Sequence, residues 1–344
     1  MAKISLAVKY RPKTFDDMTE QEYIKIILEN QIKDDAIQNA YLFTGPAGCG
    51  KTTSARIFAN MINESKGNPI EIDAASNNGV EQVRSIIDEA KFKPIDSKYK
   101  VYILDECHML SIGAWNAMLK LLEEPPKTTI FILCTTDPQK IPKTILSRVQ
   151  RYDFQKISIK GIVQRLNYIV NQERQGDFQE EALEYIAKVS DGGMRDAISM
   201  LDKCLSFSCD ITIDNVVKAL GISDYNSLDN LLESMVLVLS PNKCIDIIEG
   251  VYNQGKDLKV FIKQFIQYCL DVAKYLMFNS YDYIQIPSTI NLSKYKDNKH
   301  YFQILDVIDS IINLSNQIKY EQNPKVLVES TIILLVTGRI KDEA

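Results

Sequence analysis

The sequence lacks the cysteine patterns that build disulfide frameworks or zinc sites. It holds seven cysteines, an odd number, and no pair of them has the C-x-x-C spacing. Disulfide-rich secreted scaffolds use an even set of cysteines, and structural zinc sites use closely spaced ligand pairs. We therefore expect free thiols, a reducing compartment and no zinc. The cysteines are Cys49, Cys107, Cys134, Cys204, Cys209, Cys244 and Cys269.

The chain also lacks a long hydrophobic run. The N-terminal segment "MAKISLAVKYRPK" carries charges at Lys3, Lys9 and Arg11 and has no apolar stretch of signal-peptide length. The longest late apolar run, residues 332–336, is far shorter than a membrane-spanning helix and follows Glu329. We expect a soluble protein of the cytoplasm, or of a host cytoplasm if the source is a virus, with no membrane partner.

Positive charge is not in excess either. The formal net charge is −5, from 40 Lys and Arg against 45 Asp and Glu. This balance argues against a protein coated in basic residues, although a local basic patch could still bind nucleic acid. Apolar residues make up 45% of the chain and charged residues 25%, an ordinary mix for a globular protein.

At 344 residues the chain is long enough for two or three domains, and its halves differ in pattern. Over the first part, short apolar runs alternate with helical patterns, which is typical of a parallel sheet covered by helices. The expected strands are residues 40–45, 70–75, 100–106, 129–136 and 150–154. The expected helices are residues 52–62, 79–92, 112–124 (capped by Ser111) and 141–147.

The remainder of the chain reads as helical. Segments 159–174, 179–189 and 193–206 predict a three-helix bundle, and helical patterns continue from residue 222. The Asn- and Lys-rich stretch 291–300 is expected to be a loop. We predict an α/β core at 1–158, an all-α domain at 159–221 and a second all-α domain at 222–344. One repeating set, Tyr301, Leu305, Ile308 and Ile312, predicts the apolar face of a late helix.

A phosphate-binding loop is the first chemical motif. Residues 45–52 fit G-x-x-x-x-G-K-[ST], follow an expected strand and precede an expected helix. Glycines let backbone N–H groups turn toward the β-phosphate, and the helix N-terminus adds partial positive charge. Lys51 is expected to reach the β- and γ-phosphates, and the Thr52 hydroxyl to hold Mg²⁺. The expected nucleotide contacts are Gly45, Pro46, Ala47, Gly48, Cys49, Gly50, Lys51, Thr52 and Thr53.

Two carboxylates, Asp105 and Glu106, end the third strand. Ligands of open α/β sheets bind beyond the carboxyl ends of the strands, so both are expected at the nucleotide. Asp105 would contact the Mg²⁺ shell, and Glu106 would polarise the water that attacks the γ-phosphate. The letters Asp-Glu-Cys-His also occur in DExH helicases. That class needs a second α/β domain, which the sequence beyond residue 158 lacks, so His108 is expected only to lie on the loop after the strand.

Seven segments occur in the order and spacing of one family. They are "VKYRPKTFDDM", "AYLFTGPAGCGKTT", "IEIDAASNNGVEQVR", "KVYILDECHML", "NAMLKLLEEPP", "CTTDPQKIPKTILSR" and "GGMRDAISMLDK". The chain resembles the clamp-loader ATPases, especially the bacterial DNA polymerase III gamma/tau subunit and more distantly the small subunits of replication factor C. The motifs are specific across residues 5–205. Beyond them the resemblance rests on helical character and on "NPKVLVESTIILL".

The resemblance implies an AAA+ ATPase that uses ATP and Mg²⁺, with a lid at 159–221 and a collar at 222–344 that assembles a pentameric ring. It implies that Arg148, in "TILSR", acts in trans on the neighbouring subunit's nucleotide. It places Thr136 at a position that senses the γ-phosphate or the attacking water, and Arg195 on a lid helix that contacts the γ-phosphate. The adenine and ribose pocket is expected to include Tyr10, Arg11 and Pro12.

The resemblance also implies partners: other loader subunits, a sliding clamp and primer–template DNA. The positions that match DNA-contacting residues of the family are Asn77, Asn78 and Lys120, with Asn77 replacing a frequent arginine. For Lys120 an ordinary solvated lysine is the alternative. Phe92 is a candidate anchor for the clamp, and a core phenylalanine is equally compatible with the sequence.

Two departures from the family and two alternatives remain. The four-cysteine zinc module of gamma/tau subunits is absent between the P-loop helix and "IDAAS", and Val149 replaces the usual cysteine of Ser-Arg-Cys. One alternative is another AAA+ DNA remodeller, such as a branch-migration motor. The other is a non-hydrolysing scaffold subunit of the loader, which the intact phosphate-binding and carboxylate motifs disfavour.

Overall fold

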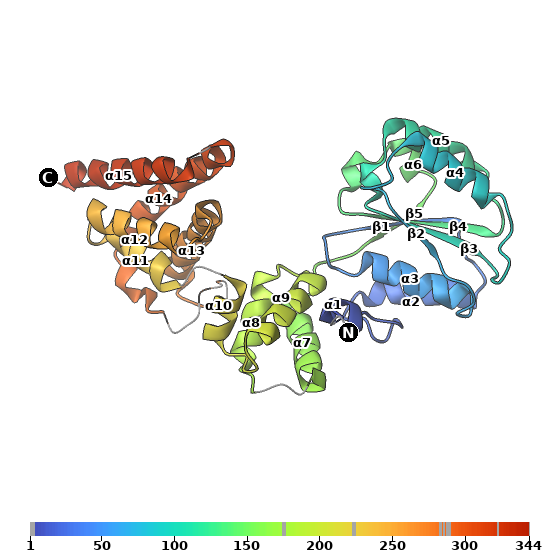
Figure 1. Cartoon of the computed structure of the whole chain (residues 1–344), viewed down its shortest axis with the longest axis horizontal. Coiled ribbons are helices and arrows are strands. Elements are labelled where there is room, and N and C mark those ends of the chain that lie inside the picture. The colour runs from blue at the N-terminus through green and yellow to red at the C-terminus, as the bar shows by residue number, and fades with distance from the viewer. Residues whose placement is uncertain are drawn as a thin grey trace. The chain divides into compact units, whose positions relative to one another are not determined.

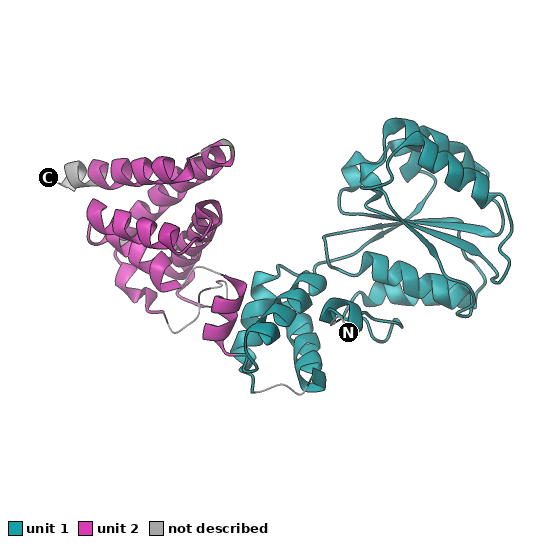
Figure 2. Cartoon of the chain, in the orientation of Figure 1, with its two compact units in different colours: residues 1–211 teal, residues 212–344 magenta. Residues whose placement is uncertain are grey.

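The computed structural model describes residues 4–173, 177–221, 225–281, 284, 286, 290–321 and 323–343. These residues form two compact units, residues 1–211 and 212–344 (Figure 2). The expected boundary at residue 222 borders residues 222–224, which lie outside the described residues. The division into three domains therefore stays a prediction, and each unit is described separately below.

Unit 1 is built on a parallel sheet in the strand order β2-β3-β4-β1-β5. The strands that the sequence predicted are all present, because strands buried on both faces read as continuous apolar runs. Every residue of β1 and of β4 is buried. The strands are β1 (Ala40–Thr44), β2 (Ile70–Asp73), β3 (Lys100–Asp105), β4 (Thr129–Thr135) and β5 (Gln150–Asp153).

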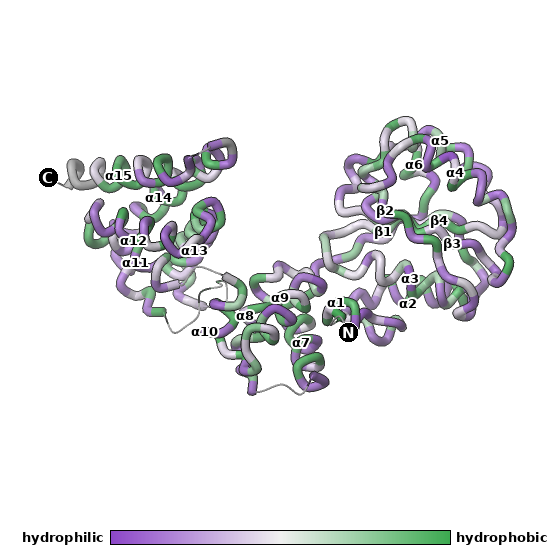
Figure 3. Tube along the Cα trace, viewed as in Figure 1, coloured by the Kyte–Doolittle hydropathy of each residue, from purple (hydrophilic) through white to green (hydrophobic). Residues whose placement is uncertain are grey.

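Helices cover both faces of this sheet (Figure 1). Helices α2 (Glu22–Lys33) and α3 (Lys51–Ile62) share one apolar core with the sheet, and α4 (Val80–Ala90) and α5 (Ile112–Glu123) share another. Hydrophobic segments concentrate in the strands and on the covering helices (Figure 3). The predicted cap of α5 is confirmed, since the Ser111 side chain accepts a hydrogen bond from the Ala114 N–H.

Short elements and a helical bundle complete unit 1. The short elements are α1 (Leu6–Lys9), η1 (Cys107–Met109), η2 (Pro138–Lys140) and α6 (Lys143–Leu146). The bundle consists of α7 (Ile159–Glu173), α8 (Glu180–Val189) and α9 (Met194–Phe207), which pack on one another as the sequence predicted.

Unit 2 is helical in its described residues. Its helices are α10 (Ile213–Leu220), α11 (Tyr225–Val236), α12 (Pro241–Asn253), α13 (Leu258–Phe278), η3 (Leu292–Tyr295), α14 (Asn298–Gln317), η4 (Ile318–Tyr320) and α15 (Pro324–Glu343). The core contains a polar cluster, because the Asp229 carboxylate accepts hydrogen bonds from Tyr268, Tyr295 and Lys294. Together, the α/β core of unit 1 and the helices that follow it confirm the predicted fold class.

Two sequence expectations in unit 2 are correct only in part. Helix α14 forms, and on its predicted face Ile308 is 7% exposed and Tyr301 packs against the core, whereas Leu305 and Ile312 are 39% and 41% exposed. Ile304, Val307 and Ile311 of this helix are fully buried. Apolar residues occur on both sides of this helix, so spacing alone did not identify the packed side. The stretch 291–300 is not a loop throughout, since η3 and the start of α14 lie within it. Asp297 caps α14 by accepting a hydrogen bond from the Lys299 N–H.

Among the described residues, the structure contains no helix whose length and apolar character would let it cross a membrane.

Candidate nucleotide site

The loop between β1 and α3 has the backbone of a phosphate cradle. The φ angles of Gly45, Gly48 and Gly50 are 146°, 71° and 107°. Residues other than glycine rarely adopt these positive φ angles. A Cβ atom on Gly45 would lie 2.5 Å from the Phe154 carbonyl oxygen. The loop therefore depends on glycine for both backbone angle and space. It leads directly into α3, whose first residue is Lys51.

Lys51, at the first position of α3, is only 6% exposed. Its Nζ atom donates hydrogen bonds to the carbonyl oxygens of Gly45 at 2.8 Å and Pro46 at 2.7 Å. The ammonium group thus lies at the cradle without a carboxylate contact among the described residues. A phosphate group entering the cradle would meet this ammonium and could replace the two carbonyl contacts.

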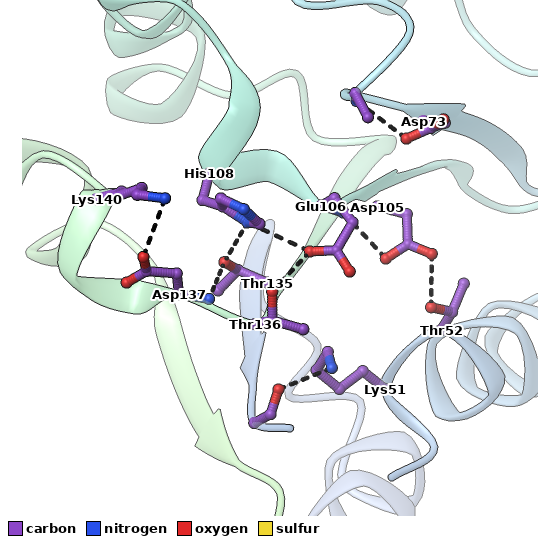
Figure 4. A network of polar contacts seen from close by, with 12 residues as sticks. Lys51, Thr52, Asp73, Asp105, Glu106, His108, Thr135, Thr136, Asp137 and Lys140 are labelled. Atoms are coloured by element: carbon purple, nitrogen blue, oxygen red, sulfur yellow. Dashed lines mark hydrogen bonds and ion pairs between the residues drawn. The ribbon is translucent and has the colours of Figure 1, made fainter. Parts of the chain in front are cut away.

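Thr52, at the start of α3, and Asp105, at the end of β3, are in contact. The Thr52 hydroxyl donates a hydrogen bond to Asp105 Oδ2 at 2.8 Å (Figure 4). The other oxygen of Asp105 accepts the Glu106 backbone N–H at 3.0 Å, which fixes the carboxylate plane. A hydroxyl and a carboxylate oxygen are hard donors that suit Mg²⁺, so the residue types fit the predicted metal.

Glu106 points away from this pair and toward the end of β4 (Figure 4). The Thr136 hydroxyl donates a hydrogen bond to Glu106 Oε2 at 3.0 Å. His108 Nδ1 lies 3.3 Å from the same oxygen and 3.1 Å from the Thr135 hydroxyl. The Thr135 hydroxyl in turn accepts the Asp137 N–H at 3.0 Å. The sequence analysis placed His108 only on the loop after β3 and did not predict its contact with Glu106.

A cavity of about 510 Å³ joins the phosphate loop, Asp105 and Glu106. Most of the residues that the sequence predicted to contact the nucleotide line this cavity. The exceptions are Gly45, Pro46 and Thr136, which do not line it. The predicted residues that line it are Tyr10, Arg11, Pro12, Ala47, Gly48, Cys49, Gly50, Lys51, Thr52, Thr53, Asp105, Glu106 and Arg195.

The N-terminal segment reaches this cavity because α7 holds it. The Tyr10 hydroxyl donates a hydrogen bond to Glu173 at 2.6 Å, and Arg165 donates to the Tyr10 carbonyl oxygen at 2.8 Å. Burial lowers the pKa of Arg11, and the nearby Arg56 guanidinium lowers it further. Arg165 also lines the cavity, and the sequence gave no sign of it, because one arginine on an amphipathic helix carries no distinctive pattern.

The helical bundle contacts the phosphate loop directly. The Met194 N–H, at the start of α9, donates a hydrogen bond to the Gly48 carbonyl oxygen at 3.1 Å. A Cβ on Gly48 would lie 3.0 Å from the Gly193 Cα, so the two backbones are in close contact. Arg195 follows on the same helix and lines the cavity.

Arg148 is not among the cavity-lining residues of the described chain. It lies after α6, where its guanidinium contacts Glu123 at 2.6 Å. Arg148 therefore lies outside this cavity.

The three predicted DNA positions fall in two places. Asn77 and Asn78 precede α4, and the Asn78 carbonyl oxygen accepts the Ser111 N–H at 3.2 Å, which links the starts of α4 and α5. Lys120 is exposed on α5, nine residues beyond Ser111 or about 13 Å along the helix axis. Phe92, the candidate clamp anchor, is 71% exposed, which rules out the core alternative.

Three cysteines of unit 1, Cys49, Cys107 and Cys134, are buried. Cys49 and Cys134 belong to the core under α2 and α3, and Cys107 belongs to the core on the other face of the sheet. Burial raises the pKa of all three thiols. We interpret these three cysteines as small packing residues.

Comparison with known families gives two matches in unit 1. Residues 68–158 match the family described as DNA polymerase III, delta subunit. Residues 161–210 match the family described as DNA polymerase III clamp loader subunit, ATPase lid domain. Among solved structures, the RuvB Holliday junction branch migration motor of Thermotoga maritima has a TM-score of 0.53 at 18% identity, covering 77% of this chain and 91% of that one. This likeness concerns the fold alone.

Curated relatives extend the similarity along the chain. DNA polymerase III subunit tau of Bacillus subtilis is 38% identical over 94% of this chain and 62% of that protein. Subunit gamma/tau of Mycoplasma genitalium is 33% identical over 89% of this chain and 55% of that protein. DNA polymerase III subunit tau of Escherichia coli is 37% identical over 67% of this chain and 39% of that protein. The resemblance is thereby confirmed, and the chain is a relative of the clamp-loader AAA+ ATPases of the DNA polymerase III gamma/tau type.

Proposed function

We propose that this chain is an ATPase subunit of a DNA sliding-clamp loader. In this proposal ATP binding lets a pentameric ring hold an opened clamp and grip primer–template DNA, and hydrolysis releases the clamp on the DNA. One observation carries the proposal. A single cavity brings together the phosphate loop, Asp105, Glu106 and the lid residue Arg195, while Arg148 lies outside it.

The cavity has the parts that phosphoryl transfer requires. Lys51 would contact the β- and γ-phosphates, while Thr52 and Asp105 would hold Mg²⁺, which neutralises charge on the phosphate oxygens when bound. Glu106 would orient the attacking water, and the Thr136 hydroxyl would hold Glu106 or the γ-phosphate. The hydrogen bond between Thr136 and Glu106 supports a common site for both.

Arg148 would complete the site of a neighbouring subunit. Its position after α6 and its absence from the lining of its own cavity support a role in trans. A cation placed against the transferring phosphate stabilises the charge of the transition state, and such arginines raise rates by about 10³–10⁵ in other nucleotidases. Hydrolysis would then depend on assembly.

The lid would couple nucleotide binding to the shape of the subunit. The hydrogen bond from Met194 to Gly48 ties the start of α9 to the phosphate loop, and Arg195 is on the same helix turn. A γ-phosphate that attracts the Arg195 guanidinium would therefore change the angle of the whole bundle.

The starts of α4 and α5 would contact the DNA backbone. Asn77 and Asn78 would supply side-chain donors, and the start of α4, which has no side-chain cap, would offer backbone N–H groups to phosphate oxygens. Lys120 lies further along α5 and would reach a different phosphate. Replacing Lys120 by alanine should weaken DNA binding equally for all sequences and lower its salt dependence by about one counterion.

An exposed apolar surface at the end of α4 would bind the clamp. Phe92 and Ile95 are 71% and 96% exposed, although both are large and hydrophobic. Aromatic side chains often anchor protein–protein interfaces, and this exposure supports Phe92 as an anchor.

The test is ATP turnover of the complex assembled with its loader subunits. Turnover should rise when both a clamp and primer–template DNA are added. Indifference to both would contradict the loader assignment. Stimulation by a four-way junction with assembly into a hexamer would favour a branch-migration motor instead, and nucleotide binding without turnover would favour a scaffold subunit.

A further inference from the structure

Three acceptors from two neighbouring segments hold the guanidinium of Arg148. Nη2 donates to Glu123 Oε1 at 2.6 Å, and Nη1 donates to the Thr144 carbonyl oxygen at 2.6 Å and to the Ser147 hydroxyl at 3.1 Å. Thr144 belongs to α6 and Ser147 caps it, whereas Glu123 is the last residue of α5. The position of the guanidinium is thus set both by Ser147, the preceding residue, and by Glu123, which lies 25 residues away in the chain.

The two supporting helices are themselves anchored. On α5, Trp115, Met118 and Leu122 are buried against the sheet, and on α6 Ile145 is fully buried. Helices α5 and α6 also contact each other. The Glu123 carboxylate therefore projects from a packed helix end, which makes it a better-defined support than a loop residue would be.

The three contacts leave part of the guanidinium available. An arginine side chain has five N–H groups, and the three hydrogen bonds use three of them. Two N–H groups remain for a phosphate oxygen. Arg148 can accordingly contact an incoming phosphate while Glu123 still holds it.

Stability is a poor explanation for the pair. The side chains of Arg148 and Glu123 are 33% and 46% exposed. Exposed ion pairs contribute about 0–1 kcal/mol to folding. What the contact does supply is order, because a long arginine side chain loses rotamer freedom whenever it is fixed in one position. Fixing it in advance lowers the entropy lost at the moment of catalysis.

We infer that Glu123 is a positioning residue for Arg148, and that it holds the guanidinium in the orientation in which it meets the neighbouring subunit's nucleotide. This inference rests on the proposed function of Arg148. Glu123 itself would not contact the nucleotide. Its removal should lower the turnover number and leave the KM for ATP unchanged, since the substrate-binding residues of each cavity stay intact.

The experiment measures ATP turnover in the assembled complex, with clamp and primer–template DNA present. Glu123→Ala should reduce the turnover number about three- to tenfold. Glu123→Gln, which keeps an acceptor oxygen, should lose less. Glu124→Ala is the matched control, because this adjacent carboxylate makes no contact with Arg148 in the described part of the chain. Thermal unfolding of the variants should match that of the original chain.

A double-mutant cycle separates this inference from the proposed function. In an Arg148→Ala background, Glu123→Ala should cause no further loss, because its only route of action has been removed. A full additional loss there would overturn the inference and leave the role of Arg148 standing. Higher turnover of Glu123→Ala would also overturn the inference, because it would show that Glu123 holds Arg148 away from its productive orientation. Full turnover of Arg148→Ala itself would instead contradict the proposed function.

Discussion

The Thr136 hydroxyl donates a hydrogen bond to the Glu106 carboxylate at 3.0 Å. Thr136 follows the end of β4 and Glu106 follows the end of β3, so the bond joins two adjacent strands at their carboxyl ends. It also shares Glu106 Oε2 with the ring of His108, which lies 3.3 Å away. The orientation of this carboxylate is therefore set by residues outside the phosphate loop.

Replacing Thr136 by valine should slow ATP hydrolysis about tenfold and leave ATP binding unchanged. Valine keeps the shape of the side chain and removes the donor, so Glu106 loses one of its fixed contacts. Single-turnover hydrolysis and binding of a fluorescent ATP analogue measure the two effects. Thr128→Val, before the opposite end of β4, is the control and should change neither. Weaker ATP binding by Thr136→Val would mean that the hydroxyl serves binding instead.

Replacing Arg148 by alanine should lower hydrolysis in the assembled complex by a factor of at least about 10³. ATP binding should stay within about twofold, because Arg148 does not line the cavity of its own subunit. Arg151→Ala is a matched control, since Arg151 is a nearby exposed arginine that pairs with Asp153. Loss of ATP binding by the Arg148 variant would place this arginine in its own subunit's site.

The clamp surface predicts a selective loss of affinity. Phe92→Ala should weaken binding of the assembled complex to the clamp by about tenfold, as expected for an aromatic anchor. Tyr23→Ala is the control, because Tyr23 is an aromatic of similar exposure on α2. Clamp affinity would be measured by equilibrium titration for the original chain, Phe92→Ala and Tyr23→Ala. Equal affinity of these three proteins would show that clamp binding does not depend on Phe92.

Thiol reactivity tests the assignment of the cysteines as packing residues. Cys209 is exposed, and the other six cysteines are buried. Since burial raises the pKa of Cys49, Cys107 and Cys134, a thiol reagent at about pH 8 should modify one cysteine quickly and the others only on unfolding. The fast phase should disappear in Cys209→Ser. Fast modification of Cys49, located by peptide mapping, would instead indicate a reactive thiol beside the nucleotide.

The sequence predicted the core of unit 1 because its signals are local. Buried parallel strands are continuous apolar runs, and the phosphate loop needs glycine at fixed positions, so β1, β3 and the Gly45 loop could be predicted directly. Asp105 and Glu106 could be placed because active sites of such sheets lie at the strand ends.

The contacts that the sequence could not predict join distant positions. Arg165 reaches the Tyr10 carbonyl from another helix, and Glu123 meets Arg148 only because α5 and α6 pack together. Neither side chain stands out in its own helix. The packed side of α14 was predicted only in part, since Leu305 and Ile304 are equally apolar and only the fold decides which of them is buried.

The most direct test compares ATP turnover per protomer before and after assembly. The purified chain at a concentration where it is monomeric should bind ATP and hydrolyse it slowly, because its cavity lacks the arginine of a neighbour. Assembly with its loader subunits should raise turnover per site by at least about 10³-fold. Full turnover by the isolated monomer, unchanged on assembly, would contradict the account of a site divided between two subunits.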